Sequence, residues 1–179
     1  FLFLFYVYQT DVGMFLLEKQ IHEDCKGFEW KKLKLDDSFQ KVTHYLQQEG
    51  KGLPIVFLPG GSMEATMLCP FSEIFKKENR PLFILENPGH GKNKAPSLDI
   101  LKKEVLDGFH WALSYSDHVQ KTLDKIGVKK FDLIGYSLGG GAGAFLMAKN
   151  SQSVNKAVFM APAGVSMVYT EQMQNIIKT

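Results

Sequence analysis

The chain has 179 residues, of which 45% are hydrophobic, and its 21 Lys and Arg against 19 Asp and Glu give a net charge of +2. This composition is too apolar for a disordered chain, and the near-neutral charge excludes a protein that binds nucleic acid through bulk charge. The length suits one domain with a single core, and no nucleic-acid partner is expected.

Residues 1–27 are predicted to form an extension before this domain. Residues 1–8 are all apolar or aromatic, but Gln9 and Asp11 end the run well short of the roughly 20 residues that a membrane-spanning helix needs. Residues 1–13 have three interpretations: translated sequence ahead of a start at Met14, the tail of a truncated anchor, or an ordinary strand. Membrane association is not expected, although residues 1–17 leave it open.

The two cysteines, Cys25 and Cys69, lie 44 positions apart and form no CxxC motif. This spacing is unfavourable for a zinc site or a redox pair. We expect two reduced thiols that pack as small apolar groups, as in a reducing compartment, and therefore a cytoplasmic location.

Four short apolar runs follow a predicted antiparallel hairpin. The hairpin covers residues 28–35 and 40–47, which alternate imperfectly on either side of a DDS turn. The apolar runs cover residues 54–58, 82–85, 131–134 and 156–160. Runs without alternation are typical of parallel strands that helices bury on both faces.

The segments between the runs are predicted to be helical over residues 64–79, 117–126 and 137–150, with Ser116 as the cap of the second helix. Alternating strands and helices indicate an α/β fold with a mostly parallel sheet. Ligands bind such sheets outside the carboxyl ends of the strands. Nine of the 16 glycines lie in three turns at those ends, which indicates a site there.

The third of these turns has the sequence GYSLG over residues 135–139, a G-x-S-x-G motif between an apolar run and a helix. A serine in such a strained turn, formed here by Gly135, Tyr136 and Gly139, presents its hydroxyl at the edge of the sheet. The start of the next helix offers unpaired N–H groups to a developing oxyanion. We expect Ser137 to be a catalytic nucleophile; the alternative is a serine in a helix-capping turn.

The first glycine turn, LPGGS at residues 58–62, is expected to supply the second oxyanion donor. An oxyanion hole needs two N–H groups, and glycine lets the backbone approach the charged oxygen. The alternative interpretation is a plain turn between a strand and a helix.

Four motifs resemble those of the α/β-hydrolase superfamily, in the branch with a lid over the pocket. They are FLPGG at 57–61, ENPGHG at 86–91, the segment 131–140 around the serine, and MAPAG at 160–164. The resemblance implies a core over residues 28–165 and the start of a lid over 166–179. It also implies a serine hydrolase of an ester, thioester or related acyl substrate, without metal or cofactor, whose oxyanion N–H groups belong to Gly61 and Leu138.

The sequence departs from the family pattern at three positions. Pro59, Glu86 and Tyr136 stand where the family usually has His, Asp and His. None of these changes removes the nucleophile.

The resemblance further implies an acid and a histidine after the serine. All five histidines precede Ser137, and one acid, Glu171, follows it. We therefore expect the triad acid and histidine to lie beyond the given chain, with the last strands of the sheet missing. His90, at the same sheet edge, is a weaker candidate base, and His110 and His118 are expected at solvated helix positions.

Two other functions stay open. Without a base, the chain fits a non-catalytic hydrolase-like protein that binds a ligand. A nucleotide-binding module is the other, because Gly139, Gly141 and Ala144 partly match the dinucleotide fingerprint, although no acidic residue follows at the required distance. The sequence determines neither the substrate nor the oligomeric state.

Overall fold

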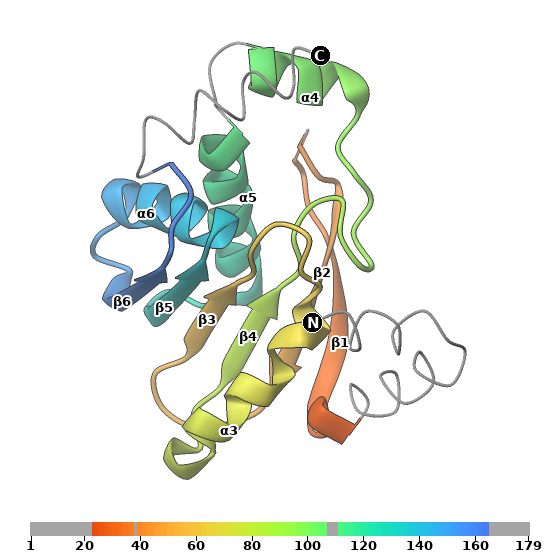
Figure 1. Cartoon of the computed structure of the whole chain (residues 1–179). Helices are drawn as coiled ribbons and strands as arrows, with labels where there is room; N and C mark the ends of the chain where they lie inside the picture. Colours follow the sequence, from red (N-terminus) through yellow and green to blue (C-terminus); the bar gives the residue numbers. More distant parts are fainter. Residues whose placement is uncertain (1–22, 38, 107–110, 165–179) are drawn as a thin grey trace, which may run out of the picture.

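The computed structural model describes residues 23–37, 39–106 and 111–164. Across these residues one six-stranded sheet runs in the order β1-β2-β4-β3-β5-β6 (Figure 1). Its strands are β1 (Phe28–Lys34), β2 (Val42–Gln48), β3 (Ile55–Leu58), β4 (Leu82–Leu85), β5 (Phe131–Tyr136) and β6 (Val154–Met160). β1 pairs antiparallel with β2, and β2 with β4, whereas β3 to β6 run parallel. The predicted α/β class and its N-terminal hairpin are confirmed.

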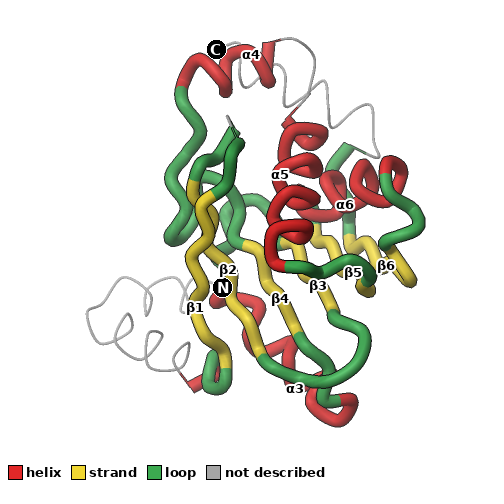
Figure 2. The backbone as a smooth tube through the Cα atoms, turned by 180° about the vertical axis from the view of Figure 1, so that it is seen from behind, coloured by secondary structure: helices red, strands yellow, loops and turns green. Residues whose placement is uncertain are grey.

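Helices cover both faces of the sheet. α5 (Trp111–Ile126) and α6 (Leu138–Lys149) lie on one face, and α4 (Leu98–Leu106) lies beyond the strand ends (Figures 1 and 2). The other face carries three short pieces, the 3₁₀ helices η1 (Ala65–Phe71) and η2 (Lys76–Glu78) and the α3 turn (Ser72–Phe75). These pieces replace the single helix predicted over 64–79, because Pro70 lies inside η1 and has no N–H to donate.

The side chains of the central strands pack into two separate hydrophobic cores. One core, toward α5 and α6, takes alternate residues of β3 and β4, namely Val56, Leu58, Phe83 and Leu85. The other core, toward η1, takes their neighbours Ile55, Phe57, Leu82 and Ile84. Both faces exclude water, which explains why these strands are continuously apolar.

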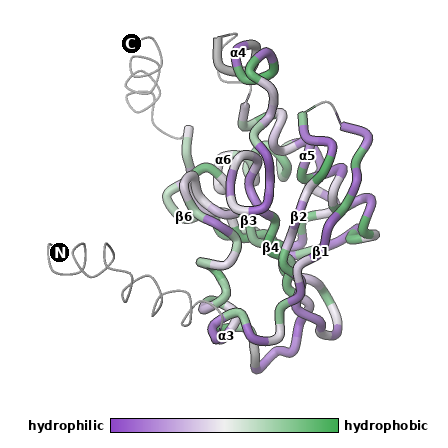
Figure 3. Tube along the Cα trace, turned by 90° about the vertical axis from the view of Figure 1, so that its right-hand side faces the viewer, coloured by the Kyte–Doolittle hydropathy of each residue, from purple (hydrophilic) through white to green (hydrophobic). Residues whose placement is uncertain are grey.

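α5 begins at Trp111 and not at the predicted 117. Ser116 is therefore not a cap: it is buried within the helix, and its hydroxyl donates to the Leu113 carbonyl at 2.7 Å. In Figure 3, α5 carries both hydrophilic and hydrophobic colours along its length. Burial of Tyr115 in the core, at 0% exposure, stabilises a first turn that the sequence pattern did not reveal.

The sequence predicted a solvated position for His118, and this prediction is wrong: the residue is buried, with 2% of its surface exposed. Its Nδ1 lies 2.9 Å from Oδ2 of Asp37, whose Oδ1 accepts a hydrogen bond from Lys121 at 3.0 Å. Burial lowers the pKa of His118, so the neutral ring donates its Nδ1 hydrogen to the carboxylate. The contact fastens the loop between β1 and β2 to α5.

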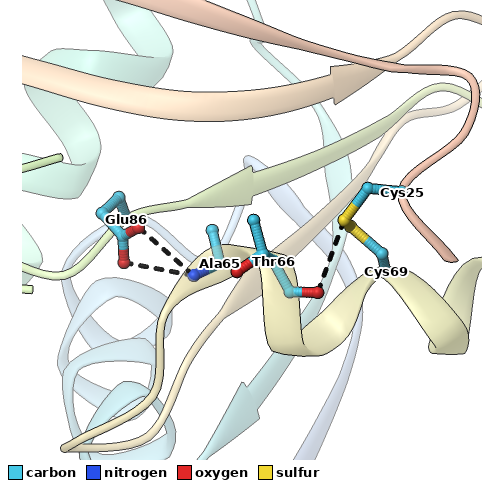
Figure 4. Close-up of a disulfide and its surroundings, with 5 residues drawn as sticks. All are labelled: Cys25, Ala65, Thr66, Cys69 and Glu86. Carbon is cyan, nitrogen blue, oxygen red and sulfur yellow. Dashed lines mark hydrogen bonds between the residues drawn. A yellow bond between two sulfur atoms is a disulfide. The ribbon is translucent and has the colours of Figure 1, made fainter. Parts of the chain in front are cut away.

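Cys25 and Cys69 form a disulfide, with their Cα atoms 5.0 Å apart (Figure 4). The prediction of two reduced thiols is therefore wrong, because the fold brings the start of β1 against η1. The two cysteines therefore do not support the prediction of a reducing compartment and a cytoplasmic location. The Cys25 sulfur also lies 3.5 Å from the Thr66 carbonyl oxygen, but a disulfide sulfur has no proton, so this is a contact and not a hydrogen bond.

Reducing this disulfide is expected to lower the free energy of unfolding by about 2–4 kcal/mol. The bond closes a loop between residues 44 apart, so it restricts the unfolded chain strongly. Denaturant unfolding with and without dithiothreitol measures the change. The Cys25→Ser, Cys69→Ser double variant is the control, because it should be destabilised already and indifferent to reductant. If the unmodified chain had the same unfolding midpoint with and without dithiothreitol, the result would contradict the disulfide.

Several predictions lie outside the described residues. These are the assignments of residues 1–22 and 166–179, and the places of His22 and His110. Among the helices that the structure describes, none has the length and apolar character needed to cross a membrane.

Candidate functional site

β5 and α6 meet in a tight turn that carries Ser137. The residue has φ 48° and ψ −112°, a backbone conformation that side-chain-bearing residues rarely adopt. Its N–H donates to the Met160 carbonyl at 2.9 Å, and its carbonyl accepts from the N–H groups of Ala163 at 2.7 Å and Gly141 at 3.0 Å. These bonds from β6, from the segment after it and from α6 hold the strained serine in place.

Two glycines of the turn have no room for a side chain. A Cβ on Gly139 would lie 2.2 Å from the Leu58 carbonyl oxygen, and one on Gly135 would lie 2.7 Å from the Gly139 carbonyl oxygen. Glycine at these positions therefore lets α6 begin directly against the end of β3.

The glycine turn after β3 lies beside the serine, as the sequence predicted. The Gly139 N–H donates to the Pro59 carbonyl at 3.0 Å. A Cβ on Gly60 would lie 3.3 Å from the Cβ of Ser137 and 2.7 Å from the Tyr136 ring. The two motifs, far apart in sequence, thus form one site at the carboxyl end of the sheet.

The backbone of Gly61 lies near the Leu138 side chain in this site. A Cβ on Gly61 would lie 3.7 Å from Cδ2 of Leu138. Within the described parts of the chain, neither of the two residues' backbone amides donates a hydrogen bond, whereas the following amides of Ser62 and Gly139 both do. The glycine turn and the serine turn therefore each carry one N–H group that has no hydrogen-bond partner among the described residues.

His90 lies at this sheet edge but contacts the glycine turn and not the serine. Its Nε2 accepts a hydrogen bond from the Ser62 N–H at 2.8 Å, so the ring hydrogen is on Nδ1, which lies 3.0 Å from the Pro88 carbonyl oxygen. Both ring nitrogens are used. His90 supports the turn and is not placed to act as the base for Ser137.

Glu86 is buried against the start of η1, three residues after the glycine turn, with 1% of its surface exposed. Its two carboxyl oxygens lie 3.2 and 3.3 Å from the Ala65 N–H (Figure 4). Burial, with a smaller contribution from the nearby Glu64, raises the pKa of the Glu86 carboxyl to about 7. The Glu86 carboxyl is therefore partly protonated at neutral pH.

This raised pKa predicts that stability falls as the pH rises from about 4.5 to about 7. In that range the folded state keeps a proton that the unfolded state releases. Glu86→Gln is expected to raise the free energy of unfolding by about 2–3 kcal/mol at pH 8 and by little at pH 4.5, since the amide oxygen can still accept from Ala65. Thermal unfolding across pH checks this, with the exposed Glu49→Gln as control; an unchanged pH dependence in Glu86→Gln would contradict it.

No base is next to the serine among the described residues. There, neither a histidine nitrogen nor a carboxylate oxygen lies within hydrogen-bond distance of the Ser137 hydroxyl, and His44 contacts Asn93 instead. Searched over the same residues, no three His, Cys, Asp or Glu side chains gather as metal ligands.

A cavity of about 660 Å³ lies apart from this site. The β1–β2 hairpin and residues 92–100 enclose it, with Phe39, Val42 and Ile100 among its lining. None of its lining residues belongs to the serine turn or to the glycine turn.

Residues 54–179 match the family model described as the alpha/beta hydrolase fold. The match covers well over half of the chain, and the chain belongs to this family.

Two curated relatives are similar over most of the chain. It is 25% identical over 133 residues to 2-hydroxymuconate semialdehyde hydrolase of Pseudomonas sp., a match of 73% of this chain and 44% of the relative. It is 28% identical over 127 residues to "Putative esterase/lipase 2" of Mycoplasma pneumoniae, covering 70% of this chain and 43% of the relative. The chain thus spans less than half the length of these relatives.

Solved structures share the fold. A bacterial membrane phospholipase A superposes with a TM-score of 0.67 at 18% identity, covering 86% of this chain and 45% of that one. An N-acyl homoserine lactonase superposes with a TM-score of 0.62 at 19% identity, covering 75% and 45%. At such identities the likeness concerns the fold alone.

Proposed function

We propose that this chain carries the nucleophile and the oxyanion-binding turn of a serine hydrolase that acts on an ester, thioester or related acyl substrate. The main support is the strained backbone of Ser137, held between a strand and a helix with the glycine turn beside it. Strain of about 1–3 kcal/mol at one residue persists where surrounding contacts enforce it, and it is common at reactive groups.

In the proposed reaction, Ser137 Oγ attacks the acyl carbon while a base takes its proton. The carbonyl oxygen becomes an oxyanion, which the N–H groups of Gly61 and Leu138 stabilise. The intermediate collapses with release of an alcohol or thiol, which receives the proton. Water then attacks the acyl-serine by the same route and releases the acid.

The proposal requires a base and an acid near the serine. No described residue fills either role, so both would come from residues that the structure does not describe. The esterase/lipase relative supports the acyl substrate class, since it shares residues of this part of the chain.

A fluorophosphonate probe tests the proposal, because it labels activated serines only. Labelling of the full-length protein should map to Ser137, and Ser137→Ala should abolish it. Ser151→Ala, which removes an exposed serine after α6, is the matched control and should label normally. Equal labelling of Ser137→Ala would refute the nucleophile, and a folded protein that takes no label would indicate a non-catalytic binding protein.

A further inference from the structure

Asn87 has a fully buried side chain that contacts the glycine turn. Its Nδ2 donates to the carbonyl of Gly60 at 2.7 Å and to that of Pro59 at 3.2 Å. Its Oδ1 accepts a hydrogen bond from the Tyr115 hydroxyl. The amide orientation follows from these partners, because the reverse would set its oxygen against two carbonyl oxygens.

The bond to Gly60 fixes the direction of the next amide. In a trans peptide the carbonyl of one residue and the N–H of the following residue point in opposite directions, and the described chain has no cis peptide. Asn87 holds the Gly60 carbonyl toward the buried side. The Gly61 N–H must then point to the exposed side, where Gly61 itself is exposed beside Leu138.

The bond to Pro59 fixes the position of the same turn relative to the serine. The Pro59 carbonyl accepts from Asn87 and also from the Gly139 N–H at the start of α6. One carbonyl therefore joins the glycine turn, the helix behind Ser137 and the Asn87 amide. A shift of Asn87 would move both the direction and the place of the Gly61 amide.

Tyr115 holds Asn87 from α5. Its ring is fully buried, and burial raises the pKa of its hydroxyl, which stays protonated and can donate to Asn87. The Tyr115–Asn87 hydrogen bond therefore links the packed core at α5 to the glycine turn.

We infer that Asn87 is a positioning residue that aims the Gly61 N–H at the oxyanion, with Tyr115 fixing its side chain; this rests on the proposed serine hydrolase function. Asn87 stands at the variable position of the ENPGHG turn, between Glu86 and Pro88. Asn87 is not the only hydrogen-bond partner of the two carbonyls that it contacts. Without Asn87 the Pro59 carbonyl keeps its bond to Gly139, and the Gly60 carbonyl keeps one from the Met63 N–H at 3.3 Å.

Asn87→Leu in the full-length protein tests this role with a p-nitrophenyl ester as substrate. We expect kcat to fall about 10–100-fold with KM changed by less than about threefold, because an oxyanion donor acts mainly in the transition state. Asn87→Asp should be at least as impaired, since a carboxylate would face two carbonyl oxygens. Tyr115→Phe should lose about 3–10-fold in the same direction.

Asn93→Leu is the matched control. Asn93 is also a buried asparagine that donates to a backbone carbonyl, that of Glu86 at 2.7 Å, but it does not touch the glycine turn. It should lose stability while kcat stays within about threefold of the unmodified enzyme. If the two Leu variants lost stability and kcat in parallel, Asn87 would be only a structural residue.

A substrate with sulfur in place of the carbonyl oxygen gives a second readout, which loss of stability would not change. Sulfur accepts hydrogen bonds poorly, so a working oxyanion hole favours the oxygen ester over the thionoester. Asn87→Leu should reduce this preference about tenfold, and Asn93→Leu should keep it. An unlabelled and inactive parent protein would refute the proposed function itself, whereas an active parent whose Asn87 variants keep kcat and the preference would refute this inference alone.

Discussion

Ser137→Ala is expected to lower kcat about 10⁴-fold or more, with KM changed by only a few-fold. The hydroxyl is the proposed nucleophile, and neighbouring groups cannot replace it. The free amides of Gly61 and Leu138 remain in the variant, so it should still bind the substrate. Hydrolysis of a p-nitrophenyl ester by the full-length protein measures both constants.

Ser137→Gly separates the lost hydroxyl from the strained backbone. Both variants lack the nucleophile and should be equally inactive. Glycine adopts φ 48° and ψ −112° without the cost that a side chain imposes. The free energy of unfolding of Ser137→Gly should therefore be about 1 kcal/mol higher than that of Ser137→Ala. Substantial hydrolysis by either variant would contradict the role of Ser137, and equal stability would contradict the strain.

Gly139→Ala is expected to destabilise the fold by about 3 kcal/mol. Helix propensity alone predicts the opposite, a gain of up to about 1 kcal/mol, because Gly139 lies within α6. The contact decides the sign: the new Cβ would lie 2.2 Å from the Leu58 carbonyl oxygen, which is backbone and cannot move aside. Activity should also fall, since α6 would be pushed away from the Pro59 carbonyl.

Gly143→Ala is the matched control, with the same substitution in the same helix. Its Cβ would lie 2.9 Å from the Phe159 ring and 3.3 Å from Cδ2 of Leu133, which are ends of side chains that can shift. We expect a loss of about 1 kcal/mol or less. Denaturant unfolding compares the two variants. A Gly139→Ala chain as stable as its parent would show that α6 does not pack against β3 this closely.

The sequence predicted the parts of the fold that depend on local patterns. Continuous apolar runs indicated strands buried on both faces, and glycine turns at their ends indicated the site. Ser137 was singled out in this way, whereas Gly61 and Leu138 were assigned through the resemblance to the hydrolase family. The structure brings the serine turn and the glycine turn together. Their roles remain predictions for the labelling and kinetic experiments.

Contacts between distant residues could not be predicted, because spacing along the chain says little about which loops meet. The Cys25–Cys69 disulfide joins residues 44 apart, and the Asp37–His118 contact joins residues 81 apart. Cysteines also pack singly as small apolar thiols, and Asp and His are also common on surfaces. Neither pair forms a motif.

The sequence by itself determined the α/β class, the hairpin and the serine turn, since each follows from backbone preferences within about ten residues. Only the tertiary structure decided how the site is supported. It showed that Glu86, Asn87 and His90, all from one turn, hydrogen-bond to the neighbouring segment. Asn87 and His90 contact Gly60 and Ser62 of the glycine turn, and Glu86 contacts Ala65 at the start of η1. These bonds exist because parallel β3 and β4 end at the same edge of the sheet, which places their following loops in contact.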